Sequence, residues 1–215
     1  MSQYFEIHPD NPNPRLIHQA AEVLRAGGIV VYPTDSCYAL GCHLDDKDAV
    51  ARIRQIRDLD EHHHLTLMCR DLSEISRYAR VDNAQFRLLK SNTPGSYTFI
   101  LDATKEVPKR LQHPKRSTIG MRIPDHPVAL ALLEEMGEPI LSTTLILPDE
   151  ARSQNNAVPL NDAEHIRELL EKKVELVIDG GAVGLEFTTV IDLTGVAPVL
   201  VRRGKGDVSH FGIEE

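Results

Sequence analysis

Residues 27–42 read GGIVVYPTDSCYALGC, an apolar run that ends in Pro-Thr-Asp and is followed by small residues. The run IVVY has the β-branched, apolar character of a buried strand. In open α/β sheets ligands bind beyond the carboxyl ends of strands, which is where the Pro-Thr-Asp falls. Pro33 restricts its own φ and holds Tyr32 in extended geometry, so the Thr34 hydroxyl has little conformational freedom. The stretch predicts either a preorganised ligand contact or, as spacing alone favours, a turn in which Asp35 bonds its own backbone.

Helical and strand patterns alternate along the rest of the chain. Asn13 suits the N-cap of a helix that a Gly-Gly pair ends, and a second amphipathic stretch runs from about 46 to 57. Buried-strand patterns occur at LTLMC, YTFILDAT and ILSTTLIL, and three short strands follow a helix around 162–172. Since no linker or repeat interrupts them, we expect residues 1–215 to form a single α/β domain, a twisted, mostly mixed sheet flanked by helices.

Composition indicates an ordinary globular protein, with 41% hydrophobic and 26% charged residues. The cysteines are three in number and lack CxxC spacing, which argues against a disulfide framework and a zinc ribbon. The first residues, MSQYFEIHPDNPNP, contain no charged leader followed by an apolar stretch, and no window is long enough to span a membrane. We therefore expect a cytoplasmic protein that does not act at a membrane, with reduced thiols.

The net charge of −8 argues against a broad nucleic-acid surface, but basic residues are clustered. A local basic groove on an acidic protein is one interpretation of this pattern, and solvated loops are the other. The main cluster lies in the segment TKEVPKRLQHPKRS and consists of Lys105, Lys109, Arg110, Lys115 and Arg116.

Familiar nucleotide and metal motifs do not occur. The sequence has neither GxxxxGK[ST] nor GxGxxG. The run His62-His63-His64 lies in a polar stretch without a matching set of Cys or Glu residues, so a solvated loop is favoured over a metal site. We expect no bound metal from this pattern.

Seven segments together resemble the YrdC/YciO family, and the YciO branch in particular. They are GGIVVYPTDSCYALGC, TPGSYTFIL, TIGMRIPDHP, PILSTTLIL, VIDGGAVG, TTVIDL and VRRG, in the order and spacing of the family and covering the whole chain. The resemblance implies a twisted α/β fold with a concave basic surface that binds double-stranded RNA or tRNA. The enzymatic members of the family, the threonylcarbamoyl-AMP synthases, join threonine, bicarbonate and ATP. The resemblance therefore implies ATP and magnesium as cofactors if that activity is retained.

The resemblance also exposes two departures from the synthases. Those enzymes carry Lys-x-Arg and Ser-x-Asn motifs whose four polar side chains grip the nucleotide phosphates. The first motif falls here on Arg57-Asp58-Leu59 and the second on Thr144-Leu145-Ile146. Leucine and isoleucine cannot supply the hydrogen bonds of arginine and asparagine, so nucleotide binding would rest on Arg57, Thr144 and a later arginine, Arg203, whose alternative is a solvated tail charge.

The amino-acid end of the family site is retained in this chain. Arg122, in MRIP, matches the family arginine that pairs with the amino-acid carboxylate, and its alternative is an ion pair that holds a loop. Thr34 would lie beside it, and Thr188 and Thr189 match the family's Ser-Thr. A threonine or threonylcarbamoyl ligand is therefore implied.

Three functions follow as hypotheses, and whether the chain is an enzyme stays open at this point. The first is an RNA-binding protein linked to N6-threonylcarbamoyladenosine in tRNA, with its nucleotide chemistry lost or altered. The second is a working threonylcarbamoyl-AMP synthase, and the third a non-enzymatic small-molecule binder. The substituted motifs favour the first over the second, and the basic loop favours it over the third.

Overall fold

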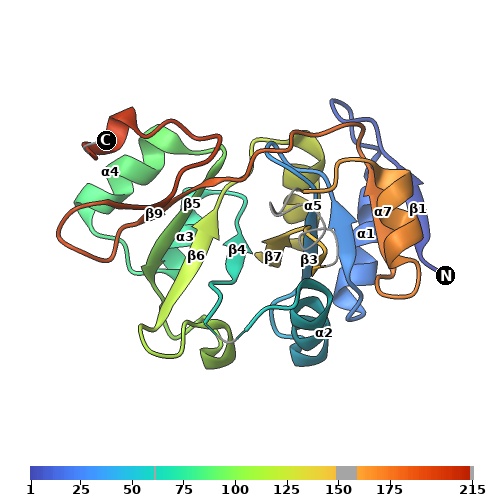
Figure 1. Ribbon diagram of the computed structural model, residues 1–215, viewed down its shortest axis with the longest axis horizontal. Helices are drawn as coiled ribbons and strands as arrows, with labels where there is room; N and C mark the ends of the chain where they lie inside the picture. Colours follow the sequence, from blue (N-terminus) through green and yellow to red (C-terminus); the bar gives the residue numbers. More distant parts are fainter. Residues whose placement is uncertain (61, 149–158, 214–215) are drawn as a thin grey trace.

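The computed structural model describes residues 1–60, 62–148 and 159–213, whose strands form one mixed sheet. The strand order is β1-β8-β2-β3-β7-β4-β6-β5-β9-β10, with parallel and antiparallel neighbours (Figure 1). The strands are β1 Gln3–Glu6, β2 Val30–Tyr32, β3 Ala39–His43, β4 Thr66–Met68, β5 Tyr97–Asp102, β6 Thr118–Arg122, β7 Ile140–Thr144, β8 Leu176–Asp179, β9 Thr189–Asp192 and β10 Val199–Arg202. The expected mixed sheet flanked by helices is confirmed.

The helices begin at side-chain caps that the sequence supplies. The Asn13 side chain accepts hydrogen bonds from the backbone N–H groups of Arg15 and Leu16, and Asp82 forms a capping box with Gln85. The helices are α1 Pro14–Arg25, α2 Lys47–Arg57, α3 Leu72–Tyr78, α4 Asn83–Asn92, α5 Pro127–Met136 and α7 Ala163–Leu170, with single 3-10 turns at Lys109–Leu111 and Ser209–Phe211.

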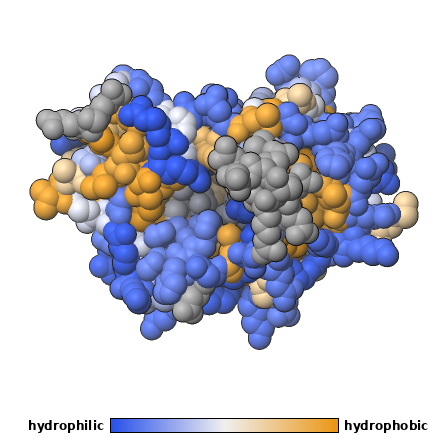
Figure 2. Space-filling view, viewed as in Figure 1, coloured by the Kyte–Doolittle hydropathy of each residue, from blue (hydrophilic) through white to orange (hydrophobic). Residues whose placement is uncertain are grey.

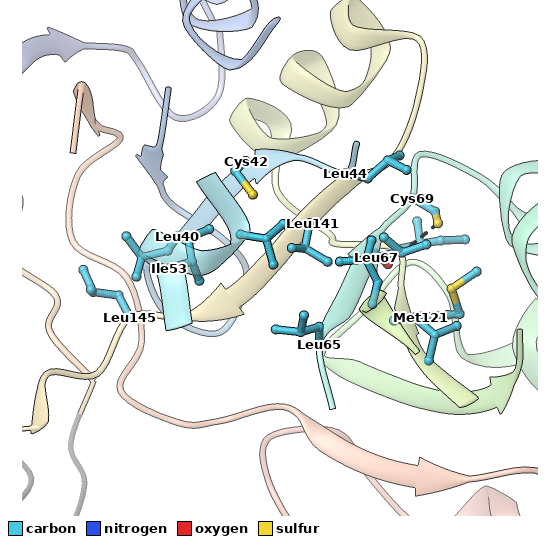
Figure 3. Packing of buried hydrophobic residues seen from close by; sticks show 14 of the residues in the cluster. Leu40, Cys42, Leu44, Ile53, Leu65, Leu67, Cys69, Met121, Leu141 and Leu145 are labelled. Atoms are coloured by element: carbon cyan, nitrogen blue, oxygen red, sulfur yellow. Dashed lines mark hydrogen bonds between the residues drawn. The ribbon is translucent and has the colours of Figure 1, made fainter. Parts of the chain in front are cut away.

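Two apolar clusters hold the helices to the sheet. One contains side chains of α1 and α5 together with strand residues such as Val30 and Ile140. The other joins α2, α3, α4 and α7 to the sheet, and Figure 3 shows Ile53 of α2 beside Leu40 and Leu141. Because every one of these side chains is almost fully removed from water, the sheet is a rigid support for the loops at its strand ends.

Several elements differ from the sequence prediction. The strand expected over ILSTTLIL ends at Thr144, because Leu145, Ile146 and Leu147 are buried outside the ladder. The helix expected at 162–172 covers Ala163–Leu170. β1, β3, β6, α3 and α4 were not predicted from the sequence, because their patterns are short and weak and they depend on pairing or packing with distant segments.

Hydrophilic residues cover most of the face seen in Figure 2, with apolar side chains gathered at the β9–β10 end. The exposed Val196, Val199 and Val201 belong to that hairpin. Within the described ranges, none of the helices is long and apolar enough to cross a membrane.

Candidate functional site

The Pro-Thr-Asp segment after β2 forms a tight, fully bonded loop. The Thr34 hydroxyl accepts hydrogen bonds from the backbone N–H groups of Ser36 and Cys37, each at 3.2 Å, and donates to the Cys37 carbonyl at 2.6 Å. The side chain is buried. Thr34 is therefore bound mainly within its own loop. Arg122 also donates to its hydroxyl at 3.4 Å, which places Thr34 beside Arg122 as expected.

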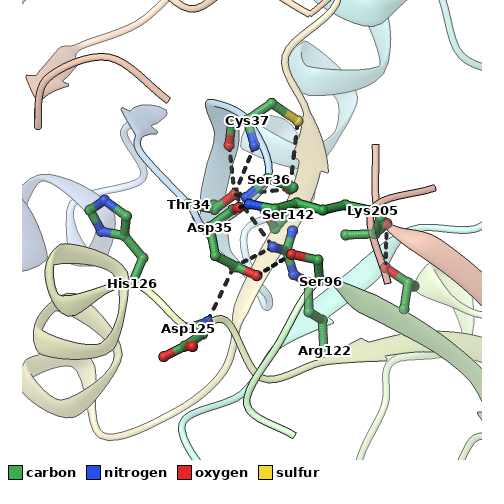
Figure 4. A network of polar contacts seen from close by, with 12 residues as sticks. Thr34, Asp35, Ser36, Cys37, Ser96, Arg122, Asp125, His126, Ser142 and Lys205 are labelled. Carbon is green, nitrogen blue, oxygen red and sulfur yellow. Dashed lines mark hydrogen bonds and ion pairs between the residues drawn. The ribbon is translucent and has the colours of Figure 1, made fainter. Parts of the chain in front are cut away.

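The next residue, Asp35, holds three other segments together (Figure 4). Its carboxylate accepts from Arg122 of β6 at 2.5 Å, from the Ser96 hydroxyl at 2.6 Å and from the Asp125 backbone N–H at 3.1 Å. Lys205 donates to its backbone carbonyl. Burial acts to raise the pKa of Asp35, but the Arg122 charge and the Ser96 hydrogen bond outweigh it and hold that pKa below its ordinary value. Pro-Thr-Asp is thus a junction between distant strands.

Arg122 forms an ion pair, which is one of the two roles that the sequence left open. One of its terminal nitrogens is bound to Asp35, and the pair is almost completely buried, with 6% and 10% of the two side chains exposed. The Nε of Arg122 is also buried and has no hydrogen-bond partner in the described structure. The ion pair therefore orients the guanidinium and leaves donor capacity unused.

A cleft of about 440 Å³ lies over the sheet beside this network. The loop after α2 forms one wall, and β10 forms the other. Gly120 of β6 keeps the floor flat, since a Cβ there would come within 2.8 Å of the Thr66 hydroxyl and 3.2 Å of the Thr98 methyl. The lining consists of Arg57, His62, His63, His64, Thr66, Thr98, Ile100, Thr143, Thr144, Ile146, Thr188, Val190, Val201 and Arg202.

The cleft continues into a smaller cavity of about 30 Å³ that reaches Arg122 and Cys37. That volume suits one water molecule or a methyl-sized group. Hydroxyl groups connect the two spaces: the Thr98 and Thr188 hydroxyls lie 3.0 Å apart, and Arg202 donates to the Thr188 hydroxyl at 3.1 Å. The threonines shared by both spaces are Thr66, Thr98, Thr143, Thr144 and Thr188.

The outer cleft holds two arginines without a carboxylate partner in the described part of the chain. Arg57 donates to the Ile146 carbonyl at 2.8 Å, and Arg202 donates to the Thr188 carbonyl at 2.9 Å. The buried Nε of Arg57 makes no hydrogen bond to any described group. Burial and the nearby Arg202 charge lower the pKa of Arg57 to about 10, and burial followed by the Arg122 charge lowers the pKa of Arg202. An anion placed here would relieve this repulsion.

Among the predicted residues, Arg57, Thr144 and Thr188 line the cleft and Arg122 lines its inner cavity. Thr189 is not part of the lining, because its hydroxyl donates to the Gly206 carbonyl at 2.6 Å. Arg203 is exposed and lies outside the lining.

Arg202 occupies the wall that the sequence-based prediction gave to its neighbour, and it was missed. Arg203 lies after the last residue of β10, and nothing in the sequence distinguishes two adjacent arginines at the end of a strand. Thr66, Thr98 and Thr143 were also missed as cleft residues, because threonine is common in strands and carries no signal of its own.

The five predicted RNA-contacting residues lie in the β5–β6 connection and are all exposed. Two of them are engaged within the protein: Arg110 donates to the Leu44 carbonyl at 3.0 Å, and Arg116 pairs with Asp192 at 2.6 Å. The lysines at 105, 109 and 115 extend from the same connection. No group of metal-binding side chains occurs among the residues the structure describes.

Comparison with known proteins agrees with this geometry. The Sua5_yciO_yrdC family model, described as Telomere recombination, matches residues 22–204. The Escherichia coli K12 protein YciO is 59% identical over 98% of this chain and 100% of its own length, and the E. coli YciO crystal structure superposes with a TM-score of 0.93. A threonylcarbamoyl-AMP synthase of Halorhodospira halophila is 29% identical over 85% of this chain and 92% of the synthase.

A structure of P. abyssi Sua5 complexed with L-threonine is similar with a TM-score of 0.81 and 27% identity. The similarity covers 94% of this chain and 58% of that one, so Sua5 contains further sequence outside the shared region. Sequence and fold lead to one conclusion: the chain belongs to the Sua5/YciO/YrdC family.

Proposed function

We propose that this chain binds structured RNA, either double-stranded RNA or tRNA, and that its cleft holds a threonylcarbamoyl-bearing adenosine. In this proposal the chain does not synthesise threonylcarbamoyl-AMP efficiently. The observation that carries the proposal is the pair Arg57 and Arg202, held in the cleft by backbone carbonyls without a neutralising carboxylate among the described residues. The relationship to threonylcarbamoyl-AMP synthases and to a threonine-bound Sua5 supports the choice of ligand.

The inner end of the cleft, where the cavity of about 30 Å³ reaches Arg122, suits the carboxylate of such a ligand, and the rest of its amino-acid part would lie in the adjoining cleft. Arg122 offers an unused buried Nε, and the surrounding threonine hydroxyls can both donate and accept. A carboxylate bound by a guanidinium makes a short, charge-assisted hydrogen bond. Replacing Arg122 by alanine would remove this hydrogen bond, and binding of L-threonine measured by calorimetry should be abolished in a variant that is still folded.

Weak ATP binding, and therefore little synthesis of threonylcarbamoyl-AMP, is the second part of the proposal. The resemblance matches Ile146 to a synthase asparagine, and Ile146 lines the cleft. Leu59, matched to the synthase arginine, packs against the core and is absent from the lining. The parent should therefore form little threonylcarbamoyl-AMP from ATP, threonine and bicarbonate with magnesium. Ile146→Asn should tighten ATP binding, and Leu145→Asn, at a fully buried neighbour, serves as the matched control that should only destabilise.

The exposed lysines of the β5–β6 connection support the RNA part, since RNA phosphates are bound largely by cationic side chains. The test neutralises lysines 105, 109 and 115 to glutamine and leaves Arg110 and Arg116 in place, because those two hold the fold. Affinity for a tRNA transcript should fall. The slope of log affinity against log salt should become shallower by about 0.9 for each phosphate that the variant no longer neutralises.

The matched control neutralises three exposed lysines elsewhere, Lys90, Lys172 and Lys173. Equal decreases in affinity for both triple variants would point to net charge alone and contradict a localised RNA site. Robust synthesis by the parent would favour the alternative, an active threonylcarbamoyl-AMP synthase. Threonine binding without any salt-sensitive RNA binding would favour a small-molecule binder.

A further inference from the structure

Three histidines from two distant segments form an aromatic cluster at the mouth of the cleft. The rings of His64 and His113 are stacked, with centroids 4.8 Å apart and an angle of 24° between their planes. The His62 ring lies against the same His113, at 5.9 Å and 42°. Because the chain has no tryptophan, its flat aromatic surfaces are made by His, Tyr and Phe side chains.

The cluster connects the two regions on which the proposed function depends. His62 and His64 line the cleft, whereas His113 belongs to the β5–β6 connection that carries the exposed lysines. Lys115 is two residues from His113 and donates its backbone N–H to the His113 Nδ1 at 3.3 Å. An RNA strand that passes from the lysines into the cleft would cross these rings.

Local hydrogen bonds hold the rings in place. His64 Nε2 lies 3.1 Å from the Thr118 hydroxyl, and the His113 carbonyl accepts from the backbone N–H groups of Arg116 and Ser117. Burial, followed by the neighbouring His113 and Arg116, lowers the pKa of His64, so this ring is uncharged at neutral pH. A fixed, neutral imidazole is a suitable stacking surface for a nucleobase.

We propose that His62, His64 and His113 form a platform on which an unpaired RNA base stacks next to the nucleoside held in the cleft. The proposal rests on the proposed RNA-binding function and adds the part of the RNA that is recognised: a single-stranded loop or bulge rather than a continuous duplex. Single-stranded bases are the ones that proteins read by stacking, since bases within a duplex already stack on each other. The lysines would hold the flanking phosphates.

The experiment compares two RNAs with equal numbers of phosphates, a stem-loop and a fully paired duplex, in parent and variants. The parent should bind the stem-loop more tightly, and 2-aminopurine placed in the loop should lose fluorescence on binding. His113→Leu should weaken stem-loop binding about tenfold, as expected when one base is no longer stacked, and leave duplex binding unchanged. His113→Phe, which keeps an aromatic face, should retain the preference.

His165→Leu, at an exposed histidine of α7, is the matched control and should behave as the parent. If His113→Leu does not fold, the exposed His62→Leu gives the same comparison. Equal binding of both RNAs by the parent, or an unchanged preference in His113→Leu, would overturn the platform while RNA binding itself stands. Failure of the parent to bind either RNA would instead overturn the proposed function together with the platform.

Discussion

Replacing Asp35 by asparagine tests whether the ion pair with Arg122 holds the site together. The variant keeps the shape of the side chain and removes its charge, which leaves the Arg122 guanidinium buried without a counter-charge. The two side chains are only 10% and 6% exposed and their atoms lie 2.5 Å apart, so solvent cannot replace the missing partner. Removing one member of a buried pair costs about 3–5 kcal/mol in the free energy of unfolding.

The decrease should lie near the lower end of that range, at about 3 kcal/mol, because asparagine can still accept the Asp125 hydrogen bond. Urea unfolding followed by circular dichroism measures it. The control is Glu106→Gln, which removes an exposed partner of Arg77 at 3.7 Å and should cost less than about 1 kcal/mol.

A double variant tests the same ion pair through an expected gain in stability. Adding Arg122→Met to Asp35→Asn removes the uncompensated charge and fills a similar volume, so the double variant should be more stable than Asp35→Asn alone. The account of a buried pair would be refuted if Asp35→Asn lost no more free energy of unfolding than Glu106→Gln. It would also be refuted if the double variant were less stable than Asp35→Asn.

Three further predictions concern the same site. Because the folded pKa of Asp35 lies below its ordinary value of about 3.9, the stability it contributes is present above that pH and lost as the pH falls through the folded pKa; acid titration of urea midpoints should show a smaller decrease in Asp35→Asn. Gly120→Ala should weaken L-threonine binding in calorimetry, because its Cβ would lie 2.8 Å from the Thr66 hydroxyl oxygen and displace that side chain in the cleft; circular dichroism checks that the variant is folded. Iodoacetamide should modify Cys37 slowly, since burial raises the pKa of that thiol, and bound threonine should slow it further, as peptide mass spectrometry can measure.

The fold was predictable where local signals agreed with tertiary packing. Asn13 caps a helix as the sequence indicated, α2 covers the predicted amphipathic stretch, and the apolar runs of β2, β5 and β8 are buried strands. Boundaries failed where burial continues beyond a hydrogen-bonded ladder, as it does after Thr144. Apolar character reports removal from water, and only the partner strand decides whether a buried segment is also a strand.

The candidate site was predictable only in part, for a different reason. Arg57, Arg122, Thr144 and Thr188 were identified through a family resemblance, and all four line the cleft or its inner cavity. The role of Asp35 was not identified from the sequence, because its partners Arg122, Ser96 and Asp125 are more than 60 residues away. Interactions of that range follow from topology and leave no local pattern.

The way in which each arginine is held distinguishes the two ends of the cleft. Arg122 is held by a carboxylate, which orients the guanidinium and also neutralises most of its charge. Arg57 and Arg202 are held by backbone carbonyls, which orient a guanidinium and leave its charge in place. The inner end is therefore suited to one small acceptor group, such as a carboxylate that meets the unused Nε of Arg122, and the outer end to a more strongly negative group. A ligand that places a phosphate near Arg57 and a carboxylate near Arg122 would match both ends at once, as the proposed threonylcarbamoyl-bearing adenosine of RNA would.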